Sequence, residues 1–245
     1  MRVLVVTDNK VMYSFFVDLV RDNVFKDIIF DFRFNKSDKS SGSNFNISNF
    51  ESIDLKKECD QIIKEYNLVI SLHCKQLFPS KLVNSVRCIN IHPGLNPHNR
   101  GWFPQIFSII NKLPIGVTIH EMDEELDHGP IIIQKELKIY DWETSYDVYK
   151  RIQLLEMDLI RENLSMIIKN DYKANLPESE GNINLKKNFE MLCEIDLDKK
   201  VSYRDAIDYF RAMSFKGYKN AYYFDKDGNK IFVEIVLEKE VAKDE

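Results

Sequence analysis

The chain has 245 residues, of which 44% are hydrophobic and 30% are charged, a composition typical of a globular protein with an apolar core. This length suits one large domain, or one average domain with a small addition. The formal net charge of -5 argues against a nucleic-acid-binding protein, because such proteins contact phosphates through basic surfaces. The apolar runs are too short for a signal peptide or a membrane span, so we expect a cytoplasmic protein that binds no membrane.

The first half of the chain alternates short apolar runs with amphipathic segments. Buried strands are predicted at residues 3–7 and 68–72, an alternating strand at 28–34 and a further strand at 88–92. Helices are predicted at residues 11–21, 54–65 and 79–85. Residues 36–49 are rich in Ser, Asn and Lys and predict an exposed loop. This order predicts an α/β fold with a mostly parallel, Rossmann-like sheet flanked by helices. The turn after the first strand contains no glycine, so we do not expect a dinucleotide site.

The second half continues the α/β pattern and ends in a smaller unit. A helix is predicted at residues 102–111, strands at 115–122 and 131–137, and a long helix at 145–169 that begins with a Thr144/Asp147 capping box. The polar residues 176–187 predict a linker. A helix at 202–213 and a β-hairpin at 221–224 and 230–237 follow. We therefore expect a catalytic domain at 1–180 and a small helix-plus-hairpin region at 181–245, which has to pack on the main domain or on a second subunit.

The four cysteines, Cys59, Cys74, Cys88 and Cys193, are scattered and form no Cys-x-x-Cys pair. Reduced thiols, most of them buried, are the expected state, rather than disulfides or metal ligands. His73, His98, His120 and His128 do not form a cluster with metal-ligand spacing, and we expect no metal. We expect structural or surface roles for His73 and His120.

Polar residues with catalytic potential stand at the end of the strand predicted at 88–92. Asn90 and His92 are two residues apart, so a strand points both side chains to the same face. The loop at 123–129 is rich in carboxylates and contains Asp127. An amide donor, an imidazole and a carboxylate together suit acid–base chemistry, although a single histidine at a strand end is more often structural.

Two sequence motifs carry a resemblance to a known family. Asn90-Ile-His-Pro-Gly94 is similar to the first signature of the folate-dependent formyltransferases, and Gly116-Val-Thr-Ile-His120 with Leu126-Asp-His-Gly-Pro-Ile-Ile132 resembles the second. The resemblance is good over roughly residues 68–168 and weak over the first 65. It implies a formyltransferase-like fold, Asn90, His92 and Asp127 as the catalytic set, and 10-formyltetrahydrofolate as co-substrate.

The next residues point to one branch of that family. Asn99-Arg-Gly101 followed by Trp102 resembles the sugar N-formyltransferases, which act on nucleotide-linked amino sugars such as dTDP-4-amino-4,6-dideoxyglucose for surface polysaccharide (O-antigen, lipopolysaccharide) synthesis. Other acceptors stay open: a 3-amino sugar nucleotide, glycinamide ribonucleotide or methionyl-tRNA. The region after the linker is too short for the basic C-terminal barrel of a tRNA formyltransferase. A non-catalytic ligand-binding relative is a further alternative, which the three catalytic residue types oppose.

The resemblance also assigns binding residues. The folate residues would be Cys74, Gln76, Leu77, Phe78, Met122, Asp123 and Leu126. The candidates for the nucleotide sugar are Asn9, Lys75, His98, Arg100, Trp102 and Tyr222. Lys75 and Arg100 suit a pyrophosphate but are equally consistent with surface cations, and Trp102 and Tyr222 suit stacking but also core packing. A homodimer through the C-terminal region is expected.

Overall fold

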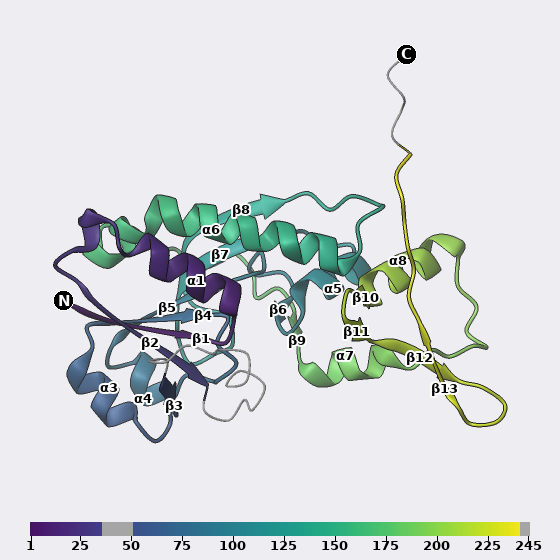
Figure 1. Ribbon diagram of the computed structural model, residues 1–245, viewed down its shortest axis with the longest axis horizontal. Coiled ribbons are helices and arrows are strands. Elements are labelled where there is room, and N and C mark those ends of the chain that lie inside the picture. Colours follow the sequence, from purple (N-terminus) through teal and green to yellow (C-terminus); the bar gives the residue numbers. More distant parts are fainter. Residues whose placement is uncertain (36–50, 241–245) are drawn as a thin grey trace, which may run out of the picture.

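The computed structural model describes residues 1–35 and 51–240, which fold around one seven-stranded sheet (Figure 1). The strands are β1 (Arg2–Thr7), β2 (Ile29–Asn35), β3 (Glu51–Ile53), β4 (Leu68–Leu72), β5 (Arg87–His92), β7 (Ile115–Glu121) and β8 (Ile131–Leu137). Their order is β3-β2-β1-β4-β5-β7-β8. The pairings from β3 to β5 are parallel, and β7 pairs antiparallel with both β5 and β8. The predicted mostly parallel α/β sheet is confirmed.

Helices cover both faces of this sheet. The helices on one face are α1 (Lys10–Leu19), α5 (Pro104–Asn111) and α6 (Ser145–Lys169), and those on the other are α3 (Cys59–Glu65) and α4 (Ser80–Val83) (Figure 1). A short 3-10 helix (Asn23–Phe25) follows α1. Successive residues of a strand point to opposite faces, so Val3 and Val5 pack with α1 and α6 while Leu4 and Val6 pack with α3 and α4. Burial on both faces explains the continuous apolar runs.

Side-chain caps fix where α1 and α6 begin. The Asn9 side chain accepts hydrogen bonds from the backbone N–H groups of Val11 and Met12 and so starts α1. Thr144 and Asp147 form the predicted capping box, and α6 has the predicted bounds. Two other helices start later than predicted. Residues 54–58 form a turn before α3, and α5 begins at Pro104 because Phe103 has a positive φ of 53°.

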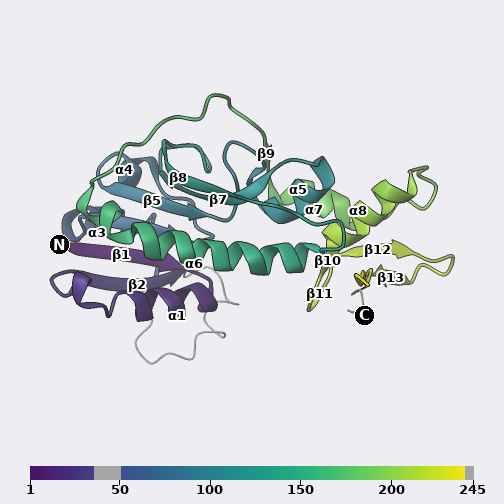
Figure 2. The same ribbon diagram turned by 90° about the horizontal axis from the view of Figure 1, so that it is seen from above.

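The C-terminal elements lie beyond one end of the sheet (Figure 2). They are α7 (Lys186–Cys193), α8 (Tyr203–Met213), the hairpin of β10 (Ser214–Phe215) and β11 (Tyr218–Lys219), and the hairpin of β12 (Ala221–Phe224) and β13 (Lys230–Val233). The predicted helix at 202–213 and the second hairpin are confirmed, with β13 ending before residue 237. Helix α7 and the first hairpin were not predicted.

The segment predicted as a linker, residues 176–187, is irregular as far as residue 182 and then contains regular structure. There β9 (Ile183–Asn184) pairs in parallel with β6 (Arg100–Gly101), and α7 begins at Lys186. The predicted loop at 36–49 lies outside the described residues. Among residues 1–35 and 51–240, no helix has the length and apolar character needed to cross a membrane, and the four cysteines are free thiols.

Candidate active site

A cavity of about 800 Å³ opens at the carboxyl ends of β1, β4 and β5. The chain leaves β1 for β2 and β3 on one side and returns to β4 on the other, so the cavity lies where the strand order reverses. Such switch points are the usual ligand sites of open α/β sheets. Asn90, His92 and Asp127 all line this cavity. The fold therefore brings together three side chains that were selected from the sequence alone.

Asp127 lies between the other two members of this group. Its Oδ1 accepts a hydrogen bond of 2.8 Å from the Asn90 amide, and its Oδ2 lies 3.5 Å from His92 Nδ1. The backbone N–H of Gly101 donates to Oδ2 over 2.9 Å, and the Asn96 side chain donates to the Asp127 carbonyl over 2.8 Å. The carboxylate is thus held from three directions in a loop whose φ at residue 127 is +48°.

His120 sets the orientation of the Asn90 amide. Its Nδ1 lies 2.7 Å from the Glu121 carbonyl oxygen, which can only accept, so Nδ1 carries the proton. Burial lowers the pKa of His120, so the ring is neutral and its Nε2 accepts a 3.2 Å hydrogen bond from Asn90 Nδ2. Both hydrogens of the Asn90 amide are therefore already used, one by His120 and one by Asp127.

The His92 ring faces Asp127 with Nδ1 and packs against Gly94 with Nε2. Its Nε2 is buried and has no hydrogen-bond partner in the described part of the chain. A Cβ on residue 94 would lie 2.3 Å from this nitrogen, so only glycine fits there. Thr118 fixes the same loop, because its hydroxyl donates to the Gly94 carbonyl and accepts from the Asn96 N–H. A side chain at position 94 would therefore displace the imidazole or the loop.

The seven residues assigned to folate all line the cavity. The Gln76 amide is held by backbone groups, because Leu55 N–H donates to its Oε1 and its Nε2 donates to the Ile53 carbonyl. Burial raises the pKa of the Cys74 thiol to about 12, so this side chain is a neutral, apolar wall. Leu77 is 76% exposed at the cavity mouth. An apolar wall with backbone polar groups fits a flat heteroaromatic ring.

The six candidates for the nucleotide sugar divide into two groups. Asn9, Lys75 and Trp102 line the cavity, whereas His98, Arg100 and Tyr222 are not part of its lining. Arg100 is the first residue of β6, and its buried side chain lies 3.9 Å from Glu180. Tyr222 packs inside the β12–β13 hairpin, where the Lys230 ammonium lies 3.6 Å from its ring centroid.

One wall of the cavity was not foreseen from the sequence. His73 Nε2 lies 2.8 Å and 3.0 Å from the two carboxylate oxygens of Glu156, a fully buried residue of α6. Asn9 donates to the Tyr149 hydroxyl over 3.0 Å, and burial raises the pKa of that hydroxyl. The other members of this wall are Phe103, Phe189, Phe215, Tyr218 and Asn220. A signal was present, since Glu156 interrupts the apolar stripe of α6 between Ile152 and Leu159.

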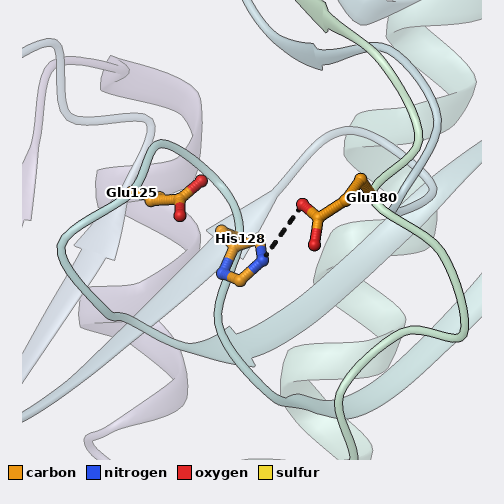
Figure 3. A group of neighbouring side chains, drawn as sticks. All are labelled: Glu125, His128 and Glu180. Atoms are coloured by element: carbon orange, nitrogen blue, oxygen red, sulfur yellow. Dashed lines mark ion pairs between the residues drawn. The ribbon is translucent and has the colours of Figure 1, made fainter.

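Glu125, His128 and Glu180 are the three described residues whose potential metal-ligating atoms gather within 4.8 Å (Figure 3). His128 pairs with Asp123 at 2.6 Å and with Glu180 at 3.5 Å, and both glutamates are exposed. The Arg100 guanidinium lies 3.9 Å from Glu180 and adds a positive charge beside these carboxylates. The group is an ion-pair network that connects the loop at 122–129 with residue 180.

Family comparison explains this arrangement of residues. Residues 3–164 match the family model described as formyl transferase. The chain belongs to the formyl transferase family. Residues 188–239 of this formyl transferase match a second model, described as the N-formyltransferase dimerization C-terminal domain.

Individual relatives cover most of this formyl transferase. A Mycobacterium tuberculosis protein named dTDP-4-amino-4,6-dideoxyglucose formyltransferase is 46% identical over 187 residues, which are 76% of this chain and 80% of that protein. The structure of a sugar N-formyltransferase from a Shewanella species aligns with a TM-score of 0.95 at 47% identity, over 98% of this chain and 99% of the other. A 4-N formyltransferase structure from Francisella tularensis aligns with a TM-score of 0.92 at 50% identity, over 98% of each chain.

Proposed function

We propose that this formyl transferase moves the formyl group of 10-formyltetrahydrofolate to the amine of dTDP-4-amino-4,6-dideoxyglucose. The observation that carries the proposal is that Asn90, Asp127 and His92 contact one another in the lining of one cavity. The relative of that name, similar over most of both chains, supports the choice of acceptor.

His92 serves as the base in this proposal. The amine attacks the formyl carbon, its proton passes to the imidazole, and the bond between the formyl carbon and N10 of the folate breaks as N10 gains a proton. Asp127, 3.5 Å from Nδ1, stabilises the imidazolium while it exists. Because Nδ1 faces Asp127, we assign the proton transfer to Nε2, the ring nitrogen that is buried beside Gly94.

Asn90 serves as the donor to the formyl oxygen, on which negative charge develops during attack. One such donor is worth roughly 100- to 1,000-fold in rate. Its two hydrogens are used by Asp127 and His120 in the ligand-free arrangement. The bond to His120 is the longer of the two, at 3.2 Å, so this is the bond that the formyl oxygen replaces.

The cavity offers separate walls for the two substrates. Cys74 and Met122 pack with the cluster formed by α3 and α4, and we place the folate on that side. The wall that contains His73, Tyr149 and Phe215 lies towards α6 and the C-terminal hairpin, and we place the nucleotide sugar there. Aromatic faces suit the base, while Asn9 and His73, which line the cavity, suit polar groups of the sugar nucleotide.

The proposal is tested by mixing the protein with 10-formyltetrahydrofolate and a panel of acceptors, followed by mass spectrometry of the formamide. The panel contains dTDP-4-amino-4,6-dideoxyglucose, a dTDP-3-amino sugar, glycinamide ribonucleotide and methionyl-tRNA. We expect the highest kcat/KM for the first. A higher value for another acceptor would reassign the substrate, and a lack of turnover with every member would contradict the proposal.

Two further assignments belong to this proposal. We assign catalysis to residues 1–180 and homodimer assembly to 181–245. This is supported by the dimerization model and by the exposed apolar side chains of Phe224 and Phe232 in the hairpin and of Val236 after it. Sedimentation of wild type and Phe232→Lys would test the dimer. We also assign the reaction to the cytoplasm and to surface polysaccharide synthesis. A formamido sugar that persists in the polysaccharide of a deletion strain would contradict the second assignment.

A further inference from the structure

A cluster of asparagine amides, centred on the buried Asn99, lies beside the cavity but does not line it. Asn99 is fully buried, and its Oδ1 accepts hydrogen bonds from the side-chain amides of Asn111 (3.0 Å), Asn182 (2.8 Å) and Asn184 (3.1 Å). Its own amide donates to Ser108 Oγ over 3.1 Å, and its backbone N–H donates to Asn182 Oδ1 over 2.9 Å. One side chain thus joins the loop before β6, helix α5 and the segment 182–184.

The backbone beside Asn99 continues this connection. Arg100 N–H donates to the Asn182 carbonyl over 3.0 Å, and Trp102 N–H donates to the Asn184 carbonyl over 2.8 Å. In a strand, successive N–H groups point to opposite sides, so the N–H of Gly101 points away from segment 182–184. That N–H donates to Asp127 Oδ2 over 2.9 Å. The same β6 residues therefore bind the 182–184 segment on one edge and the catalytic carboxylate on the other.

Gly101 cannot shift freely within this arrangement. Its φ is +92°, and a Cβ on this residue would lie 2.4 Å from the Asn184 carbonyl oxygen. The position of its N–H is consequently set by how segment 182–184 is fixed against the loop, and Asn99 supplies most of the side-chain bonds that fix it. Asp127 has to keep its place between Asn90 and His92 to within a fraction of an ångström for catalysis.

We propose that Asn99 is a positioning residue, which fixes the Asp127 carboxylate through segment 182–184 and the Gly101 N–H. The proposal rests on the catalytic role of Asp127 in the proposed function. It assigns a catalytic effect to a residue outside the cavity lining, and it gives the segment 182–184 a part in the reaction.

The test compares Asn99→Gly with Asn99→Asp and Asn188→Ala. Glycine keeps the left-handed backbone that residue 99 adopts at φ +50° but removes the acceptor. Aspartate keeps an acceptor for the three amides. Asn188 caps the Leu185 N–H in the same region, outside the bonds that join segment 182–184 to Asn99, so Asn188→Ala controls for general loosening of the segment.

For Asn99→Gly we expect kcat to fall by up to about 100-fold with KM for folate unchanged, because a displaced Asp127 stabilises the transition state less while the folate wall is untouched. Asn99→Asp should keep most of the wild-type kcat. Asn188→Ala should lower the melting temperature and leave kcat unchanged.

The outcomes separate this proposal from the proposed function. The ¹⁵N signals of the His92 ring report its contact with Asp127 without any substrate, and we expect them to shift in Asn99→Gly and to stay in place in Asn188→Ala. Unchanged ring signals together with unchanged kcat in Asn99→Gly would overturn the positioning role. If Asn99→Gly does not fold, Asn182→Ala takes its place, because it removes two of the bonds to Asn99. The ¹⁵N signals of the His92 ring should then shift in the same direction by a smaller amount. Wild-type turnover failing while the shifts occur would contradict only the proposed function.

Discussion

Asn90 donates its side-chain amide to Asp127 Oδ1 over 2.8 Å, so a strand-end residue and a loop residue form one hydrogen-bonded unit. The carboxylate also accepts the Gly101 N–H at its second oxygen. An ionised aspartate can accept at both oxygens, whereas an asparagine has one acceptor. The two donors around residue 127 therefore require a carboxylate.

Asp127→Asn should lower kcat by about 100- to 10,000-fold. The His92 imidazolium loses its counter-charge, and either the Asn90 amide or the Gly101 N–H then faces the NH₂ group of the new side chain. Folate affinity, measured by titration calorimetry, should stay within about threefold. Asp205→Asn makes the same chemical change at an exposed residue of α8 and should leave kcat unchanged. A kcat for Asp127→Asn close to that of Asp205→Asn would remove Asp127 from the catalytic set.

Gly94→Ala should displace the His92 ring, because the added methyl would lie 2.3 Å from Nε2. We expect kcat to fall at least about tenfold and the free energy of unfolding to fall by about 1–3 kcal/mol, as is typical of overpacking. Urea titration and steady-state kinetics measure the two effects. As a control, Gly228→Asn changes a glycine of the distal hairpin, at φ +81°, to a residue that tolerates this backbone.

Glu156→Gln should weaken binding of the nucleotide sugar while binding of folate is retained. The substitution keeps the shape but removes the charge that holds His73, and a hydrogen bond to a charged group contributes about 1.5–3 kcal/mol. KM for the acceptor should rise roughly 10-fold or more. Glu162→Gln, at an exposed position of the same helix, is the matched control. Equal KM values for the two variants would exclude the His73 wall from the acceptor site.

The ion-pair network at His128 should make stability depend on pH. The hydrogen bond to Asp123 raises the pKa of His128 above its ordinary value of 6.5. A raised pKa in the folded state stabilises the fold below about pH 6.5, and this stabilisation is lost as the pH rises through the raised value. Glu125 also favours the protonated ring, as does Glu180 at 3.5 Å, whereas Arg100 opposes it. The difference in melting temperature between wild type and His128→Gln should therefore be largest near pH 6 and shrink towards pH 9. A difference that grows with pH would show that the pairing is not ionic.

The features that the sequence predicted are those with local causes. The bounds of α6 follow from the Thr144 capping box and its apolar stripe, and the shared face of Asn90 and His92 follows from the strand period. Features with distant causes were missed or misread. Residues 183–184 find their partner strand about 80 residues earlier, so their polar composition alone suggested a linker. Tyr222 was chosen for its aromatic ring, and the ring packs in its own hairpin.

The two sides of the cavity come from different stretches of the polypeptide. The side assigned to folate is built from residues before 130, whereas the opposite wall takes Tyr149, Phe189, Phe215 and Tyr218 from later elements. Recombination near the start of α6 would exchange much of the acceptor wall and leave the donor side intact. Such hybrid genes offer a route by which one ancestral transferase could acquire new sugar preferences without rebuilding its one-carbon chemistry.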